Sequence, residues 1–159
     1  MKNKEYIEYT YKHRLVVIYL AKKYFPNNKE LLKQVELHDL DKLFLYLFFN
    51  KKDVSKLHRD LNYHHDNELE KSKLDYIEMV LDWESARYTK DDKPLNAYDT
   101  LVNYYSNMKD EILPILKEMN IDKPSMPKED DVCRYVDEIN NISIDDIKND
   151  LKNYLDLVL

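Results

Sequence analysis

The chain of 159 residues contains no glycine. Phosphate-cradling loops and dinucleotide-binding turns need glycine, because the backbone there takes positive φ angles or approaches the ligand closely. The sequence therefore excludes P-loop and Rossmann-type folds. Turns must instead use asparagine, aspartate and proline, as in Pro26-Asn27-Asn28, Lys93-Pro94 and Asn140-Asn141.

Between these breaks, apolar residues recur every three to four positions, which is the pattern of amphipathic helices. We predict an all-α, single-domain bundle of about six to seven helices. The predicted helices span residues 3–24, 28–47, 52–65, 70–88, 96–119, 128–139 and 143–158. Pro114 predicts a kink or a restart in the fifth helix. Residues 1–119 form the expected core, and residues 120–159 a helical extension packed on it.

Charge and cysteine content limit the classes of partner. The net charge of −6 argues against an extended nucleic-acid-binding face, which needs clustered Lys and Arg, but it allows a small phosphorylated substrate in a locally basic pocket. The start of the chain lacks a signal-peptide pattern, and no segment is apolar enough to predict a membrane span. The single Cys133 cannot form an internal disulfide. We therefore expect a cytoplasmic protein without membrane contact.

The histidines are gathered in one part of the chain. All five lie within the first 65 residues, namely His13, His38, His58, His64 and His65. Solvated surface histidines would have no reason to avoid the rest of the sequence. The spacing of His58, Asn62 and His65 at i, i+4 and i+7 predicts one shared helical face.

A second polar series lies further along the chain. Glu78, Asp82 and Ser85 repeat the i, i+4, i+7 spacing among apolar neighbours. A buried carboxylate in such surroundings must be paired with a cation or bind a metal. Imidazole and carboxylate together suit Zn²⁺, Fe²⁺ or Mn²⁺.

The order His13, then His38-Asp39, then Asp82 resembles the H…HD…D signature of the HD-domain superfamily of metal-dependent phosphohydrolases. The stretch from His38 to Lys42 also resembles the HD-x-x-K form of that motif. Together with His58-x3-Asn62-x-His64-His65 and Glu78-Met-x2-Asp82-Trp83, it is similar to a group of small HD-like proteins from bacteria and their phages. The similarity covers about residues 8–105; Asp41 departs from the group, which more often carries a small residue there.

The resemblance implies a metal site and a reaction. The implied ligands of a divalent transition metal (Mn, Fe, Co, Zn or Ni) are His13, His38, Asp39 and Asp82. Adjacent helix residues point about 100° apart, so the His38-Asp39 pair can reach one ion only from a helix end or from the crowded wall of a bundle. The implied reaction is hydrolysis of a phosphate ester, with a nucleotide or similar small phosphorylated molecule as substrate.

Further residues receive expected roles around this metal. The expected catalytic residues are Lys42, His58 and His65, and the expected substrate-binding residues are Lys42, Asn62, His64 and Arg87. We expect His58 and one of the His64-His65 pair to enter the pocket, either as ligands of a weaker second metal or as donors to the phosphate and the leaving oxygen.

Other interpretations remain open at this point. His13 could be an ordinary helix residue, and Asp82 could pair with Arg87 or Lys73. The same ligand set supports O₂-dependent oxidation with two irons in related folds, and a non-catalytic protein could sequester a nucleotide or a protein. The C-terminal helices could cover the bundle or form a homodimer interface through Leu157-Val158-Leu159.

Overall fold

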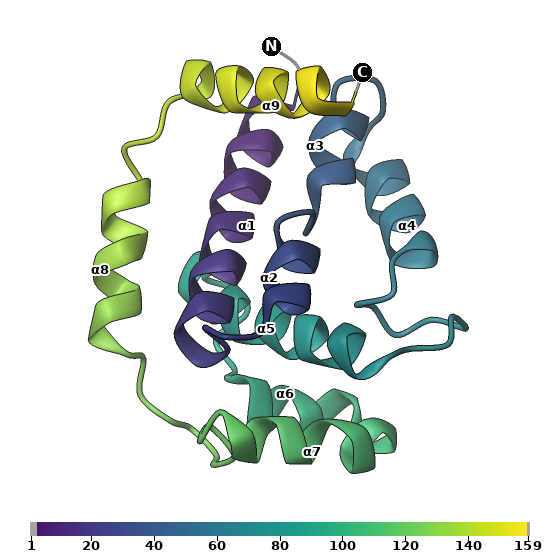
Figure 1. Ribbon diagram of the computed structural model, residues 1–159, viewed down its shortest axis with the longest axis vertical. Helices are drawn as coiled ribbons and strands as arrows, with labels where there is room; N and C mark the ends of the chain where they lie inside the picture. Colours follow the sequence, from purple (N-terminus) through teal and green to yellow (C-terminus); the bar gives the residue numbers. More distant parts are fainter. Residues whose placement is uncertain (1–2, 159) are drawn as a thin grey trace.

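The chain folds around a long N-terminal helix, α1 (Lys4–Tyr24), as Figure 1 shows. The computed structural model describes residues 3–158, apart from the side chains of residues 155, 157 and 158. Over these residues it contains nine α-helices and one short 3₁₀ helix, and no strand. The prediction of an all-α bundle in one domain is therefore confirmed.

Two of the predicted helices are each divided in the structure, and a third ends earlier than predicted. After α1 the elements are α2 (Lys29–Val35), α3 (Leu40–Leu45), α4 (Lys51–Leu61), α5 (Lys73–Thr89), α6 (Ala97–Tyr104), the 3₁₀ helix η1 (Ser106–Met108), α7 (Lys109–Glu118), α8 (Asp130–Ile139) and α9 (Ile144–Val158). The predicted helix 28–47 is divided into α2 and α3, and the predicted helix 96–119 into α6, η1 and α7. The predicted helix 52–65 ends as α4 at Leu61.

The break after α6 lies at Tyr105 rather than at Pro114. Tyr105 leaves the helical conformation with φ −134° and ψ 35°, and its ring stacks on that of Trp83 at a centroid distance of 4.6 Å. Pro114 lies inside α7, on its exposed side. The helix therefore breaks nine residues before Pro114, at Tyr105, whose ring contacts Trp83 of another helix.

Helices α1 and α5 pack against each other and both contribute to the larger apolar cluster. The cluster between and around them includes Val16, Val17 and Leu20 from α1, Ile77, Val80 and Leu81 from α5, and Leu101, Ile112 and Leu116 from α6 and α7. Each fully buried aliphatic side chain of this size stabilises the fold by about 1.5–3 kcal/mol. The pair of α1 and α5 is thus a rigid support for the polar residues that these helices also carry.

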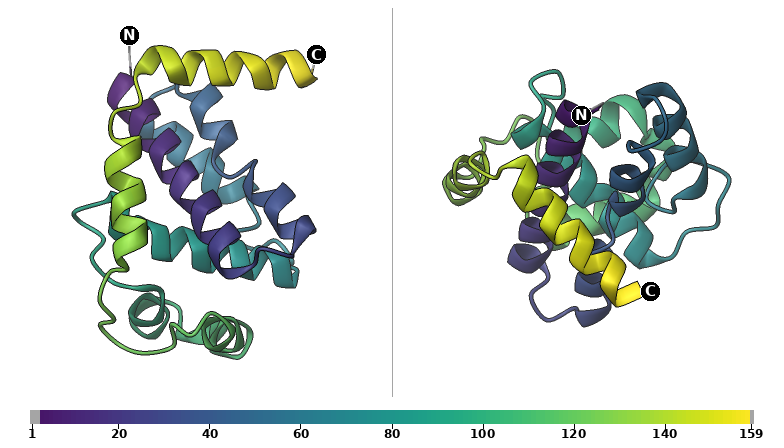
Figure 2. Two further views of the ribbon diagram at one scale, coloured as in Figure 1. Left: turned by 60° about the vertical axis from the view of Figure 1, so that its left-hand side comes forward. Right: turned by 90° about the horizontal axis from the view of Figure 1, so that it is seen from above.

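The C-terminal helices pack on the rest of the bundle. Figure 2 shows α8 running beside α1, and α9 crossing one end of the molecule above α1 and α3. Ile147 and Leu151 of α9 are buried in a second apolar cluster with Ile7 and Leu43, which agrees with the expected role of a cover. The predicted interface residues Leu157-Val158-Leu159 lie outside the described side chains.

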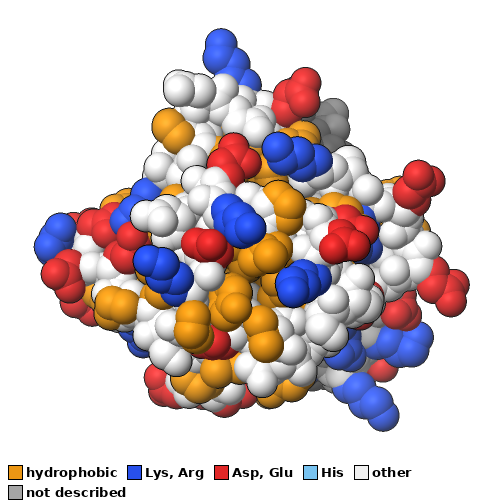
Figure 3. Space-filling view, turned by 90° about the horizontal axis from the view of Figure 1, so that it is seen from below, with side chains coloured by type: hydrophobic (Ala, Val, Ile, Leu, Met, Phe, Trp, Pro, Cys, Tyr) orange, Lys and Arg blue, Asp and Glu red, His pale blue; other side chains and the backbone are white. Residues whose placement is uncertain are grey.

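The opposite end of the molecule is formed by α6 and α7. Figure 3 shows this face, where hydrophobic side chains form a band between scattered acidic and basic ones. Val102 and Tyr104 of α6 are among the exposed large hydrophobic residues of the protein. Within residues 3–158, no helix combines the length and the apolar character that crossing a membrane requires.

Candidate metal centre

Four separate parts of the chain bring the histidines to one buried place. His13 lies on α1, His38 between α2 and α3, His58 on α4, and His64 and His65 in the segment that follows α4. Asp82 reaches the same place from α5, and Asp39 from the start of α3. The structure thus brings these residues together, and Asp82 contacts His13 and His38, whereas Arg87 lies against Glu84.

The break between α2 and α3 lies at the His38-Asp39 pair. Asp39 precedes α3 and has a left-handed backbone, with φ 55° and ψ 12°. A continuous helix would point the two side chains about 100° apart, and the left-handed residue removes this restriction. His38 Nε2 consequently lies 3.5 Å from Asp39 Oδ1. The conformation costs about 1–2 kcal/mol for most residues other than glycine and less for Asp or Asn, whose short polar side chains can hydrogen-bond locally.

One group of potential ligands consists of the four residues that the resemblance implies. One side-chain atom from each of His13, His38, Asp39 and Asp82 lies within 4.8 Å of the others. Asp82 Oδ1 is 2.7 Å from His13 Nε2 and 3.3 Å from His38 Nε2. Ligands about 2.1 Å from a shared ion stand about 3.0–3.4 Å apart in octahedral or tetrahedral geometry. The observed separations therefore suit a single divalent ion.

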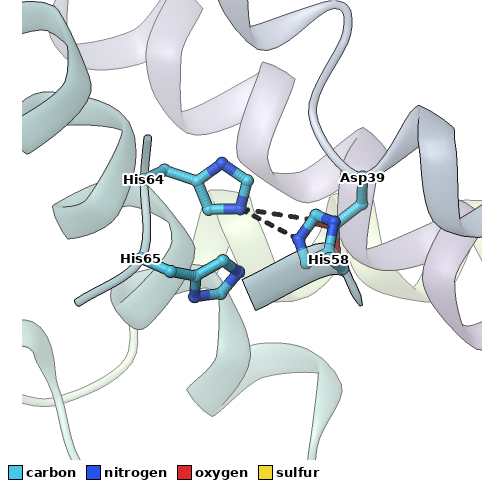
Figure 4. Close-up of side chains that lie close together, drawn as sticks. All are labelled: Asp39, His58, His64 and His65. Carbon is cyan, nitrogen blue, oxygen red and sulfur yellow. Dashed lines mark hydrogen bonds and ion pairs between the residues drawn. The ribbon is translucent and has the colours of Figure 1, made fainter. Parts of the chain in front are cut away.

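A second group shares Asp39 with the first. Asp39, His58, His64 and His65 also offer atoms within 4.8 Å of one another, and Asp39 Oδ1 lies 2.8 Å from His58 Nε2 and 3.5 Å from His64 Nε2. Figure 4 shows the rings of His58 and His64 directed at Asp39, with His65 beside them. The expectation that only one residue of the His64-His65 pair enters the site is wrong, because α4 ends before them and Asn62 is extended.

The outward-facing nitrogens of the histidines are held by other side chains. The contacts of Nδ1 are His38 with Glu78 Oε1 at 3.0 Å, His58 with Asp41 Oδ2 at 2.8 Å, His13 with Thr89 Oγ1 at 3.3 Å, and His64 with Glu78 Oε1 at 3.5 Å. Metal-binding histidines are oriented in this way, since a partner on one nitrogen fixes the ring and leaves the other nitrogen for the metal. Here Nε2 of each ring faces the shared centre.

Two of these supporting residues were missed from the sequence. Asp41 is the departure from the resembling group, and the structure assigns its carboxylate to His58. No sequence signal singles out Thr89, which reaches His13 from the end of α5.

Several buried polar atoms of the cluster lack a partner. His38 Nε2, Asp39 Oδ1 and His65 Nε2 make no hydrogen bond within the part of the chain that the structure describes, even though Asp39 Oδ1 is close to His58. A buried polar atom without a partner costs about 1–3 kcal/mol. Cations in the two ligand groups would satisfy these atoms, with His38 in the first group, His65 in the second and Asp39 in both, so the residues fit bound metal.

The electrostatics of the cluster keep its carboxylates ionised. Burial raises the pKa of Asp39, but the charges of His38 and Lys42 outweigh burial and hold this pKa well below its ordinary value. Burial lowers the pKa of His38, but Asp39, Asp82 and Glu78 outweigh it, and this pKa is well above its ordinary value. Without metal, a proton on His38 therefore takes the place of the cation.

Two of the expected substrate-binding residues have other contacts. Asn62 Nδ2 donates to Asp41 Oδ2 at 3.1 Å and to the His58 carbonyl at 2.8 Å, so it supports the residue that orients His58. Arg87 is buried, lies 3.2 Å from Glu84 Oε1 and donates to the Met126 carbonyl at 3.0 Å. Five positions separate Arg87 from Asp82, which turns it about 140° away on the helix.

Lys42 lies at the cluster as expected. Its Nζ is 3.4 Å from Asp39 Oδ2, and its side chain is 21% exposed. An ammonium group at the edge of a metal site can reach both solvent and a bound anion.

Comparisons with protein-family models, curated proteins and solved structures find no match to this chain. What the cluster does must therefore be inferred from its residues and their chemistry.

Proposed function

We propose that this protein is an HD-type, metal-dependent phosphohydrolase that acts on a nucleotide or a similar small phosphorylated substrate. The observation that supports it most is the arrangement of the rings of His13, His38 and His58. Each ring is held through Nδ1 and directs Nε2 at a carboxylate of the cluster. Imidazole nitrogens and carboxylate oxygens together suit divalent Mn, Fe, Co, Zn or Ni.

The first ion would be held by His13, His38, Asp39 and Asp82, and a second by His58, His64 and His65 with Asp39 shared between them. Divalent metal in such a site polarises a phosphoryl oxygen and lowers the pKa of water toward neutrality. In hydrolysis the water oxygen bonds to phosphorus, the ester P–O bond breaks, and the leaving oxygen takes up a proton.

The chain's own residues have distinct parts in this proposal. Lys42 supplies a positive charge for the phosphate oxygens, next to Asp39. Burial lowers the pKa of His65 to about 3, so that the ring is neutral near pH 7. A neutral imidazole suits a metal ligand better than a proton donor, and we therefore propose His65 as a ligand rather than as the acid of the reaction.

The test begins with metal content. The purified protein is reconstituted with Mn²⁺, Co²⁺ or Fe²⁺, its bound metal is measured, and mononucleotides, cyclic nucleotides and oligonucleotides are screened for ester hydrolysis by chromatography of the products. We expect bound metal and hydrolysis in the parent chain, and loss of both in His38→Ala and Asp39→Ala. A parent chain that binds no metal after reconstitution would contradict the proposal.

A di-iron oxidase is the second candidate, because two ligand groups share the carboxylate of Asp39. Such an enzyme would contain about two irons per chain, consume O₂ and hydrolyse none of the phosphate esters. A sequestering protein would return its ligand unchanged from the same screen. Measurements of iron content, O₂ consumption and hydrolysis products on one preparation therefore separate the three classes.

A further inference from the structure

A second lysine lies beside the metal cluster, on the side of His13. Lys90 follows directly after α5, next to Thr89, whose hydroxyl is 3.3 Å from His13 Nδ1. Its ammonium lies over the ring of Tyr9, 4.9 Å from the centroid, and that ring stacks on His13 at a centroid distance of 6.1 Å. Lys90 is thus held at the cluster by an aromatic ring rather than by a carboxylate.

The two lysines flank one ligand group, because Lys42 contacts Asp39 while Lys90 lies over the ring that stacks on His13. Burial lowers the pKa of Lys90, and the positive charge of Lys42 lowers it further, against the opposing effect of Asp82 and Asp92. Both side chains are half-buried, so solvent screens them incompletely. Lys42 has Asp39 as an ion partner, whereas no carboxylate of the described residues comes within ion-pair distance of Lys90.

Charge balance indicates what could lie between them. The carboxylates of Asp39, Asp41, Glu78 and Asp82 lie in the cluster, Lys42 contacts Asp39, and Lys90 lies beside the cluster; Asp92, which also acts on Lys90, is exposed to solvent and is left out of the charge count. With two divalent ions bound, the site has a surplus of about two positive charges. A terminal phosphate carries a charge of about −1.5 to −2 near pH 7, whereas a phosphodiester carries only one negative charge.

We propose that Lys90 and Lys42 together bind the terminal phosphate of a phosphomonoester, so that the enzyme acts on monoesters in preference to diesters. This inference rests on the proposed function for the reaction, but not for the binding of the anion. It adds Lys90 to the site and narrows the substrate class from nucleotides in general to those with a terminal phosphate.

The experiment measures the binding of inorganic phosphate to the metal-loaded full chain by calorimetry, with metal content determined on each sample. The variants are Lys42→Gln, Lys90→Gln and Lys90→Arg, and the matched control is Lys93→Gln, which removes an exposed cation from the same loop. We expect the Kd for phosphate to rise at least about tenfold in Lys42→Gln and in Lys90→Gln at unchanged metal content. Lys90→Arg and Lys93→Gln should stay close to the parent.

Turnover gives a second and separate result. The parent should cleave p-nitrophenyl phosphate faster than bis(p-nitrophenyl) phosphate, and Lys90→Gln should lose more activity on the monoester. Equal phosphate affinity in Lys90→Gln and Lys93→Gln overturns the inference, and leaves the proposed function standing if the parent still hydrolyses esters. A metal-loaded parent that binds phosphate through Lys90 but hydrolyses no ester contradicts the proposed function alone.

Discussion

At the scale of single residues, Glu78 is the carboxylate that orients histidines of both ligand groups. Its Oε1 is 3.0 Å from His38 Nδ1 and 3.5 Å from His64 Nδ1, while Gln34 Nε2 donates to Oε2 at 2.8 Å. Glu78 is buried on α5, one helical turn before Asp82. One side chain therefore links the rings of the two groups to the rigid core helix.

The substitution Glu78→Gln keeps the shape of this side chain and removes its charge. We expect metal affinity to fall about 10–100-fold, because the histidines lose the acceptor that holds their orientation. Competition with a chromophoric chelator measures the change. The control is Glu84→Gln, which alters another buried carboxylate of α5 whose partners are Arg87 and the Ala97 amide. Equal loss of affinity in the two variants would contradict the role of Glu78.

The raised pKa of His38 predicts how metal stabilisation depends on pH. Charged His38 stabilises the metal-free fold below its ordinary pKa of 6.5, and this contribution is lost as pH rises through the raised pKa. The carboxyl pKa values of Asp39 and Asp82 are lowered, so their contribution is lost only in acid, below their ordinary value of 3.8. Metal binding requires neutral His38 and therefore strengthens as pH rises.

As pH rises, the metal-free fold loses the contribution of charged His38 and metal binding becomes stronger, so both effects increase the stabilisation by metal. We expect the difference in Tm between Mn²⁺-loaded and EDTA-treated protein to be larger at about pH 8 than at about pH 6. Thermal unfolding followed by circular dichroism measures it. A difference that shrinks toward pH 8 would show that protonated His38 does not compete with the metal.

At the scale of elements, the ends of helices build the site. α2 ends at Val35, α3 begins after Asp39, and α4 ends at Leu61. His38 and Asp39 lie between α2 and α3, and His64 and His65 lie in the segment after α4. The periodic apolar pattern continues through residues 28–47, which is why the pattern predicted one helix there.

The left-handed residue at the start of α3 can be tested apart from the metal. Asparagine adopts this conformation readily and alanine does not. We expect Asp39→Asn and Asp39→Ala both to lose metal. In EDTA, the free energy of unfolding of Asp39→Ala should be about 1 kcal/mol lower than that of Asp39→Asn. Urea denaturation measures the difference, and equal stability would exclude strain at this position.

At the scale of the whole molecule, α9 closes the end of the bundle where α1 begins. Ile147 and Leu151 are buried against Ile7 of α1, and the Tyr11 hydroxyl donates to Asp150 Oδ2 at 2.7 Å. The same helix places Tyr154 against the guanidinium of Arg14, whose carbon lies 5.1 Å from the ring centroid. The extension is thus attached by both apolar and polar contacts.

A chain ended after Ile142 removes this cover. We expect it to aggregate or to unfold at a lower temperature, because apolar residues of α1 and α3 become exposed. Light scattering of the truncated and full chains measures the outcome. A soluble truncated monomer derived from a dimeric parent would instead identify α9 as the interface between two copies of the chain.

The local pattern of residues predicts much of this architecture. The absence of glycine and the spacing of apolar residues every three to four positions were enough to predict an all-α bundle, because helix faces are defined by neighbours along the chain. The i, i+4, i+7 spacing likewise placed Glu78, Asp82 and Ser85 on one face, and all three contact His13 or His38. The residue types of the cluster were also recognisable as metal ligands.

The convergence of these ligands depends on contacts between distant parts of the chain. Asp39 adopts its left-handed backbone where His38 meets Glu78, 40 residues away, and no local pattern reports such a partner. Arg87 and Lys90 are both cations near the end of α5, yet one is buried against Glu84 and the other lies beside His13. Sequence gives a side chain its chemistry, whereas its partner is set by the packing of helices far apart in the chain.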